Sequence, residues 1–222
     1  MNVEIQSFRS QLDWLQCHGQ IVSLHEAVKR RAEPGAERLY ALTFDDGYSD
    51  VYLNAFPLIE ERGIPFTLYL TSGPIENPDG FPNWPGEPLT WGHAREMIDS
   101  GLVTVGAHTH SHPDMSTLGD EAIRSEISAS NTLIEERCGV VPRHFTYPWG
   151  RWSFTADAIV RSTYDTATVG SGSGISADAD VHRLHRLPIQ RSDIRFLFEH
   201  KLRSGARIED RARRLIRQYK GL

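Results

Sequence analysis

The sequence is poor in cysteine and has no long apolar run. Its 222 residues include only Cys17 and Cys138, without the spacing of a disulfide framework, which favours free thiols in a reducing compartment. No stretch approaches the roughly 18 apolar residues of a membrane span, and residues 1–13 lack the basic start and apolar core of a signal peptide. We therefore expect a cytoplasmic protein without a transmembrane segment.

Signatures of several large enzyme classes are also missing. There is no G-x-S-x-G nucleophile elbow and no Walker A motif, and the glycine run at 170–174 does not match the dinucleotide-binding pattern G-x-G-x-x-G. The net charge of -5 and the pI near 6.1 argue against a general nucleic-acid partner.

Charge is nevertheless uneven along the chain. From Arg195 to the C-terminus there are nine Lys or Arg residues against three acidic ones, so this part carries +6 and the rest -11. A solvated helix face explains such a stretch most simply. An anionic partner for a basic helical tail over about 195–222 is the sharper alternative.

Apolar runs of strand type alternate with helical patterns along most of the chain. The expected strands lie at 39–44, 64–70, 102–107, 144–147, 165–169 and 184–190. This alternation favours an α/β domain with a parallel sheet, either barrel-like or doubly wound. Because the sequence shows no internal repeat and no clear linker, we expect residues 1–222 to form a single domain.

Local signals place several boundaries. Ser23 and Thr90 are expected to cap the starts of helices, and Gly139 is expected to end a long one. Pro57 lies inside a helical pattern and is expected to kink or split it. A proline-rich loop is expected between residues 73 and 88.

The first chemical motif is Asp45-Asp46-Gly47, directly after the strand at 39–44. Neighbouring strand side chains point to opposite faces, so both carboxylates share a site only if the strand stops and the chain turns, as Gly47 permits. One carboxylate then suits a metal ligand and the other a proton carrier. Taken alone, the Asp-Gly pair is explained more simply as a hairpin turn.

Three histidines, His108, His110 and His112, follow the strand at 102–107. Imidazole is the commonest side-chain metal ligand at neutral pH, so such a cluster favours a metal site over structural histidines. One helical turn would bring His108 and His112 to one face, and we leave His110 outside the ligand shell. With Asp46 they give three ligands and leave positions open for water and substrate.

The order of these ligands separates the set from other metal enzymes. The zincin signature H-E-x-x-H is absent, because Thr109 occupies the glutamate position. Non-haem iron oxygenases also use two histidines and one carboxylate, but usually in another order, so oxygenase chemistry is a disfavoured alternative.

A third cluster spans residues 143–150, at the end of another strand. Its backbone N–H groups are placed to stabilise an oxyanion, although a buried aromatic turn explains this stretch better when it is taken alone. All three clusters follow strands, and α/β barrels gather catalytic residues from several strands at that face.

On these motifs, the sequence resembles the polysaccharide deacetylase family, the NodB homology domain of the carbohydrate esterases. Residues 43–47 (TFDDG) look like its first motif, residues 108–112 fit its second, H-[ST]-x-x-H, and residues 145–150 are similar to its third. The resemblance implies a NodB-like, distorted (β/α) barrel with about seven parallel strands.

The resemblance also implies roles for individual residues. Asp45 would be the general base, and the backbone N–H of Trp149 would be an oxyanion donor. One divalent metal ion, with zinc favoured by the ligand type, would be held by Asp46, His108 and His112.

The late motifs depart from the family pattern. Where the third motif often carries an arginine, this chain has Thr146, and Arg143 is the nearby substitute. The fourth motif has no counterpart, and Leu184-His185 is the loose match to a late Leu-x-His motif, which makes His185 the expected general acid. We also expect Tyr147, Arg143 and Trp84 to contact substrate.

The expected function is metal-dependent removal of N-acetyl groups from an amino sugar in a glycan or glycan precursor. A nucleotide- or lipid-linked sugar, or a small non-polymeric amide, is the alternative substrate for the same chemistry. A non-catalytic carbohydrate-binding relic is the alternative from another class. The presence of Asp45 disfavours a relic, which has no need of a base.

Overall fold

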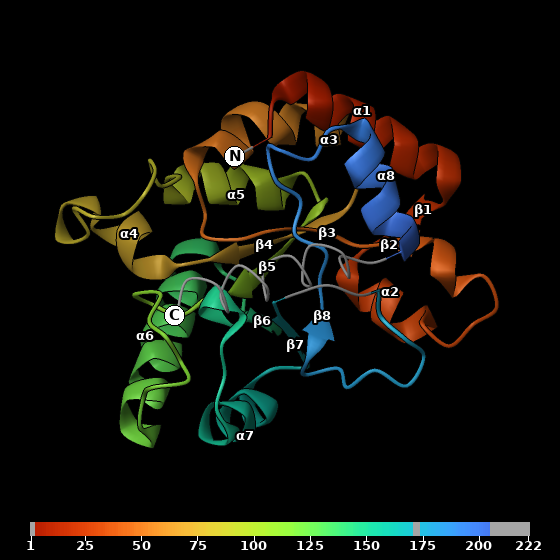
Figure 1. The fold of residues 1–222 in the computed structure, drawn as a ribbon. Helices are drawn as coiled ribbons and strands as arrows, with labels where there is room; N and C mark the ends of the chain where they lie inside the picture. The colour runs from red at the N-terminus through yellow and green to blue at the C-terminus, as the bar shows by residue number, and fades with distance from the viewer. Residues whose placement is uncertain (1–2, 171–173, 205–222) are drawn as a thin grey trace, which may run out of the picture.

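Six parallel strands pair in sequence order to form one curled, open sheet (Figure 1). The computed structural model describes residues 3–170 and 174–204. The strands of the sheet are β3 (Leu42–Phe44), β4 (Phe66–Leu70), β5 (Val103–Ala107), β6 (His144–Thr146), β7 (Thr166–Val169) and β8 (Leu184–His185). Because all six run parallel, their carboxyl ends lie along the same rim, and β3 and β8 are the outer strands.

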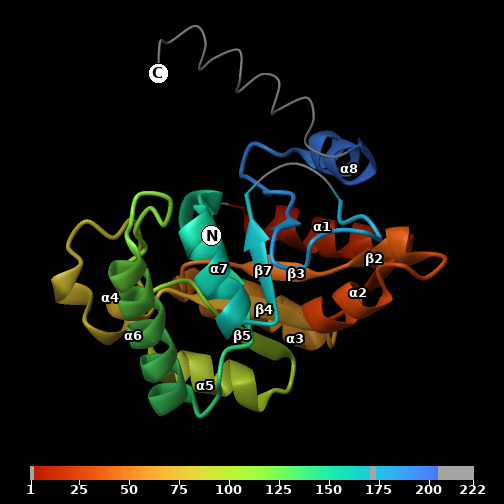
Figure 2. The same ribbon diagram turned by 90° about the horizontal axis from the view of Figure 1, so that it is seen from below.

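Helices surround the sheet, most of them on its outer side (Figures 1 and 2), whereas the helix at residues 24–30 places Leu24 against Tyr69 and Leu184 of the inner face. The helices are α1 (Ile5–His18), α2 (Leu24–Arg30), α3 (Phe56–Glu61), α4 (Ser72–Glu76), α5 (Trp91–Asp99), α6 (Asp120–Cys138), α7 (Phe154–Thr163) and α8 (Arg195–Ser204). Helix α6 packs between α5 and α7, and α8 packs on α1. The predicted barrel-like α/β domain is therefore observed as a half-barrel.

Strand β4 shows why the sheet has two apolar faces. All five of its residues are buried, as expected for a parallel strand covered on both sides. Phe66, Leu68 and Leu70 belong to the large core beneath the helices. Tyr69 points the other way, into the interior of the half-barrel, where it packs with Leu184.

The capping signals are confirmed. The Ser23 hydroxyl accepts a hydrogen bond from the N–H of Glu26 (3.2 Å) at the start of α2. Thr90 caps α5 in the same way, and Gly139 ends α6 with a φ of 71°. The helix around Pro57 is split into a π-helical turn, Val51–Ala55, and α3, with the proline in the first turn of α3, where its missing N–H costs nothing.

The strands differ from expectation in number and length. The run at 39–44 divides at Ala41, so β2 (Leu39–Tyr40) pairs with β1 (Gln20–Ile21) while β3 pairs with β4. The main sheet therefore has six strands among the described residues rather than about seven. The last strand ends at His185, and the loop at 73–88 contains α4 and a 3-10 turn.

The expected basic tail begins with α8, and its remainder, 205–222, lies outside the described residues. In the part of the chain that the structure describes, no helix is both long and apolar enough to cross a membrane.

Candidate active site and metal centre

The first two clusters predicted from the sequence, together with Trp149 from the third, meet at the carboxyl ends of β3, β5 and β6. Asp45 and Asp46 follow β3, and His108 directly follows β5. Trp149 lies in the turn after β6, and its ring centroid is 4.8 Å from that of His112. The pairing of β3 with β4, β4 with β5 and β5 with β6 places these strand ends side by side.

Asp46, His108 and His112 form a compact donor set. Asp46 Oδ1 is 3.3 Å from His108 Nε2 and 3.5 Å from His112 Nε2, and the three ligand atoms lie within 4.8 Å of one another. Tetrahedral zinc with ligand bonds near 2.1 Å needs ligand atoms about 3.4 Å apart. The two separations from Asp46 fit that geometry, and the two histidine nitrogens lie within 4.8 Å of each other, so these residues fit a zinc-like cation.

The second nitrogen of His108 strengthens this assignment. His108 Nδ1 lies 2.8 Å from the backbone carbonyl oxygen of Thr146, which can only accept, so Nδ1 carries a proton. In the neutral imidazole, Nε2 then directs a lone pair at the carboxylate of Asp46, and a cation between them resolves this opposition. A carbonyl behind the ligating histidine is the usual second contact in metal sites.

His112 is kept neutral. Burial, together with the neighbouring His108, lowers the pKa of His112 to about 4, in spite of the carboxylates of Asp46 and Asp45. A neutral imidazole is the form that binds metal. The backbone N–H of His112 donates to Thr109 Oγ1 at 3.1 Å, which fixes the turn that presents the ring.

The histidine turn is held from behind by α6. Glu126 accepts hydrogen bonds from the backbone N–H groups of His110 (2.9 Å) and Ser111 (2.8 Å) and from the Ser111 hydroxyl (2.7 Å). His110 Nδ1 lies 3.0 Å from Ser72 Oγ. His110 thus points away from the donor set and is not one of the proposed ligands.

Asp45 is paired with an arginine that no sequence motif indicated. Arg186 donates two hydrogen bonds to the carboxylate, from Nη1 to Oδ1 at 2.6 Å and from Nη2 to Oδ2 at 2.7 Å. Burial alone would raise the pKa of Asp45, but the charge and hydrogen bonds of Arg186 outweigh it, and the pKa lies below its usual value. Asp45 is therefore ionised at neutral pH, as a proton acceptor must be.

Two tryptophans flank His112. The ring centroid of Trp84 is 5.8 Å from that of His112, at 82°, and Trp149 meets the imidazole at 73°. The Trp149 side chain is 69% exposed. An exposed indole beside a donor set is a surface on which a sugar ring can stack.

Two other residues expected at the site, Tyr147 and Arg143, lie elsewhere. Tyr147 is buried in the core against Phe145. Arg143 precedes β6, at the opposite end of the strand from Trp149, and pairs with Asp165 at 2.6 Å. His185 is exposed and is the last residue of β8, directly before Arg186. The positions of Tyr147 and Arg143 give no support to roles in substrate contact.

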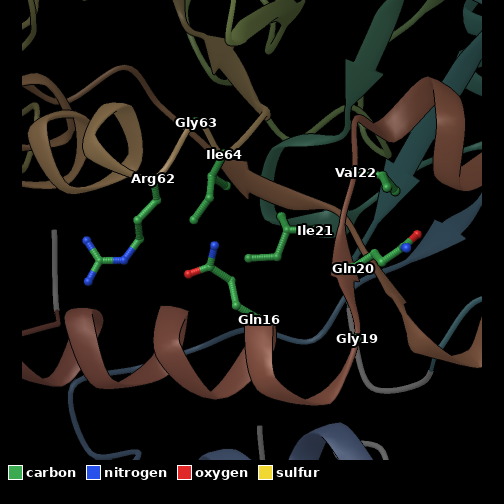
Figure 3. Close-up of a pocket in the computed structure, with 8 residues that line it drawn as sticks. All are labelled: Gln16, Gly19, Gln20, Ile21, Val22, Arg62, Gly63 and Ile64. Carbon is green, nitrogen blue, oxygen red and sulfur yellow. The ribbon is translucent and has the colours of Figure 1, made fainter.

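A pocket lies at the other end of the sheet. Its volume is about 340 Å³, and it lies where α1 leads into β1, beside the turn before β4 (Figure 3). Arg62 is the one charged residue among those lining it, and its guanidinium already donates to Asp13 and to the carbonyl of Leu58. This pocket has no group suited to acid–base or metal chemistry.

The chain is similar to known proteins of one family. Residues 32–166 match the family model described as polysaccharide deacetylase. YxkH of Bacillus subtilis (strain 168), assigned by name to the polysaccharide deacetylases, is 24% identical over 193 residues, which are 85% of this chain and 66% of that protein. The poly-beta-1,6-N-acetyl-D-glucosamine N-deacetylase of Escherichia coli (strain K12) is 31% identical over 124 residues, or 50% of this chain.

The chain therefore spans less than two thirds of the length of these relatives, and the match covers only 18% of the E. coli protein. Among solved structures, IcaB from Ammonifex degensii superposes with a TM-score of 0.75 and 26% identity. The superposition covers 90% of this chain and 88% of that one.

Proposed function

The chain belongs to the polysaccharide deacetylase family, and on this premise we propose that it hydrolyses N-acetyl groups of an amino sugar in a glycan or glycan precursor. The observation that carries the proposal is the convergence of Asp46, His108 and His112 beside an ionised Asp45. Bound by these three ligands, a divalent cation, zinc by ligand type, would polarise the acetyl carbonyl and acidify a water.

Asp45 is the general base of the proposed reaction. Its carboxylate takes a proton from the attacking water as the water oxygen bonds to the acetyl carbon. Both carboxylate oxygens accept from Arg186, but each has a second lone-pair site, so capacity for the proton remains. General-base catalysis of this kind contributes about 10²–10⁴-fold to the rate.

Trp149 supplies the oxyanion contact. It lies in a turn with a φ of 58° after β6, and its ring is 4.8 Å from that of His112; its backbone N–H would donate to the acetyl oxygen as negative charge develops there. Its exposed ring and that of Trp84 would contact the sugar.

The proton is then returned to the leaving nitrogen. The carbon–nitrogen bond breaks, acetate leaves, and the amine takes the proton that Asp45 holds. His185, at the carboxyl end of β8, is the alternative donor for this step. One base that becomes the acid keeps the proton count balanced without a second group.

The test measures acetate release from N-acetylhexosamine monomers and oligomers. The zinc-loaded protein is compared with chelator-treated protein and with Asp45→Asn, which keeps all three proposed metal ligands. We expect release that chelator abolishes, zinc restores and Asp45→Asn lacks. Release that is unaffected by chelator, or absent from every sugar with zinc bound, would overturn the proposed function.

A further inference from the structure

A second pocket lies in the groove where α8 packs on α1 (Figure 1). Its volume is about 160 Å³, and a cavity of about 150 Å³ holds one benzene molecule, so there is room for a single six-membered ring. Trp14 of α1 and Phe198 of α8 form its apolar walls, with ring centroids 5.8 Å apart at 85°. His18 stacks on Trp14 at 3.9 Å and holds the indole in place.

The polar groups that line this pocket lack partners. Gln11 and Trp14 are each 7% exposed, and within residues 3–170 and 174–204 neither the Gln11 side-chain amide nor the Trp14 indole N–H makes a hydrogen bond. Asp193 is also buried, and its Oδ1 is enclosed without a hydrogen-bond partner. Because native proteins rarely leave buried polar groups unpaired, three of them at one pocket indicate a ligand that pairs them.

The charge of Asp193 is already balanced. Its Oδ2 accepts a hydrogen bond from Lys201 Nζ at 2.6 Å and another from the backbone N–H of Gln190 at 2.7 Å. The side chains of Lys201 and Asp193 are both buried, so water screens this ion pair little. A cation in the pocket would share a charge that Lys201 already balances, whereas a hydroxyl could donate to Oδ1 without adding charge. The pocket therefore favours a neutral ligand.

A sugar ring meets these requirements. Each hydroxyl both donates and accepts, so one ring can donate to Asp193 Oδ1, accept from the Trp14 N–H, and do both with the amide of Gln11. The apolar faces of the ring can pack against aromatic side chains. Aromatic walls that carry a few fixed polar groups are typical of small-molecule sites.

We propose that the groove between α1 and α8 is a second, non-catalytic binding site for one sugar ring of an N-acetylated glycan. Phe8 of α1 packs at 6.0 Å against Phe44, which directly precedes Asp45. From Arg186 at the active site to Asp193 at the pocket the chain can span at most about 25 Å. A glycan of several residues can therefore reach both sites. The identity of the sugar rests on the proposed function.

The first experiment observes Trp14 directly. The indole N–H signals of the five tryptophans are followed by NMR while N-acetylglucosamine is added to zinc-loaded Asp45→Asn, which does not consume it. The variant Trp14→Phe identifies the Trp14 signal. We expect this signal to shift with half-saturation at about 1 mM, which is typical of a ligand of this size. No shift at about twentyfold higher concentration would overturn the proposal.

Variants of the lining test where the sugar binds. Gln11→Leu keeps the size of the side chain and removes the amide, so we expect the dissociation constant at Trp14 to rise by up to about tenfold. Ser10 lines the pocket and is exposed, so Ser10→Leu obstructs the mouth and should abolish the shift. Its matched control is Ser128→Leu, at an exposed serine within α6. Wild-type affinity in Ser10→Leu, or equal losses in both serine variants, would overturn the proposal even if Gln11→Leu fails to fold.

Two probes test the class of ligand. Cyclohexanol matches the sugar ring in size but has a single hydroxyl, and tetramethylammonium tests the pocket as a cation site. We expect both to bind at least about tenfold more weakly than N-acetylglucosamine, because they leave lining groups unpaired. Equal or tighter binding of either probe at Trp14 would overturn the assignment to sugar.

The same spectra separate this inference from the proposed function, because Trp84 and Trp149 report on the active site. A shift of Trp14 without acetate release from any sugar would refute the proposed function alone. Acetate release without a shift of Trp14 would overturn this inference alone. Where both hold, we expect Ser10→Leu to raise KM for oligomers and to leave kcat and the KM of monomers unchanged. An unchanged KM for oligomers would show that one glycan does not occupy both sites.

Discussion

The two ends of the sheet make sharp turns with different residues. At the amino ends, Gly63, Gly101 and Gly139 precede β4, β5 and β6 with φ of 60°, 74° and 71°. At the carboxyl ends, residues with side chains enter the same backbone region beside Gly47 (77°) and Gly150 (65°). Of the described residues, every non-glycine with positive φ is at this end: Asp46 (72°), Thr109 (65°), His112 (59°) and Trp149 (58°).

This difference shows where the protein tolerates backbone strain from a positive φ. A non-glycine residue in the left-handed region costs about 1–2 kcal/mol, and nothing at the amino ends requires a side chain there. At the carboxyl ends Asp46 and His112 are in the donor set, Thr109 holds the turn of His112, and Trp149 flanks it. Strain collected at one rim is thus an independent sign that the rim carries function.

The largest expected effect comes from replacing His112 with either alanine or glycine. Both changes remove one of three proposed metal ligands, so we expect zinc affinity to fall by about a thousandfold or more, measured by titration against a competing chelator. The two variants differ only in backbone freedom. If the positive φ of His112 strains the backbone, metal-free His112→Gly is more stable than His112→Ala by about 1 kcal/mol. Equal stabilities would show that the carboxyl-end turns are no more strained than the glycine turns at the amino ends.

Substitutions of Asp45 and Asp46 distinguish loss of the general base from loss of the metal ion. Asp45→Asn keeps the three ligands and removes the base, so turnover should fall by about 10²–10⁴-fold with zinc still bound. Asp46→Asn should lose zinc instead, and turnover with it. Metal content and acetate release are measured on both variants, and retained turnover in Asp45→Asn would remove it from the base role.

Lowering the pH should destabilise the metal-free protein, because it contains buried histidines that are neutral when folded. The pKa of His112 is about 4 in the folded protein against 6.5 for the exposed group, so the unfolded chain takes up the proton first. For this group, metal-free stability is full above pH 6.5 and falls as the pH drops toward 4, by roughly 3 kcal/mol in all.

A His112 variant isolates the contribution of this residue to the pH dependence of stability. Burial also lowers the pKa of His144, at the amino end of β6, so the wild-type curve contains both histidines. We expect His112→Gln to lose less stability than the wild type between pH 6.5 and 4, in denaturant titrations. Parallel curves would mean that His112 is not held neutral.

Much of the rim could be predicted from the sequence because its signals are local. The acids and histidines stand directly after apolar runs, and parallel strands bring their carboxyl ends together whatever the loops do. Strand direction would also have placed Arg143 correctly, since it precedes β6. Alternation would have buried Tyr147, which shares a strand face with the core residue Phe145.

The rest depended on contacts between distant parts of the chain. Arg186 is 141 residues from Asp45 in sequence, and no local pattern pairs the two outer edges of an open sheet. The division of the apolar run at 39–44 has the same origin, because its first half pairs with β1 and its second half pairs with β4. The positive φ of Thr109 and of Trp149 also could not be predicted, because tertiary packing at the carboxyl ends of the strands sets the geometry of their turns.

The smallest expected effect tests the amino-end turns. A Cβ at Gly139 would meet no atom within 4 Å, so Gly139→Ala changes only the backbone cost of its φ. We expect a loss of about 1 kcal/mol in the free energy of unfolding, with kcat and bound zinc unchanged. Gly139→Asn should lose less, because asparagine enters the left-handed region more readily. Equal losses for alanine and asparagine would point to side-chain contacts instead of φ, and the contrast between the two rims would then not rest on strain.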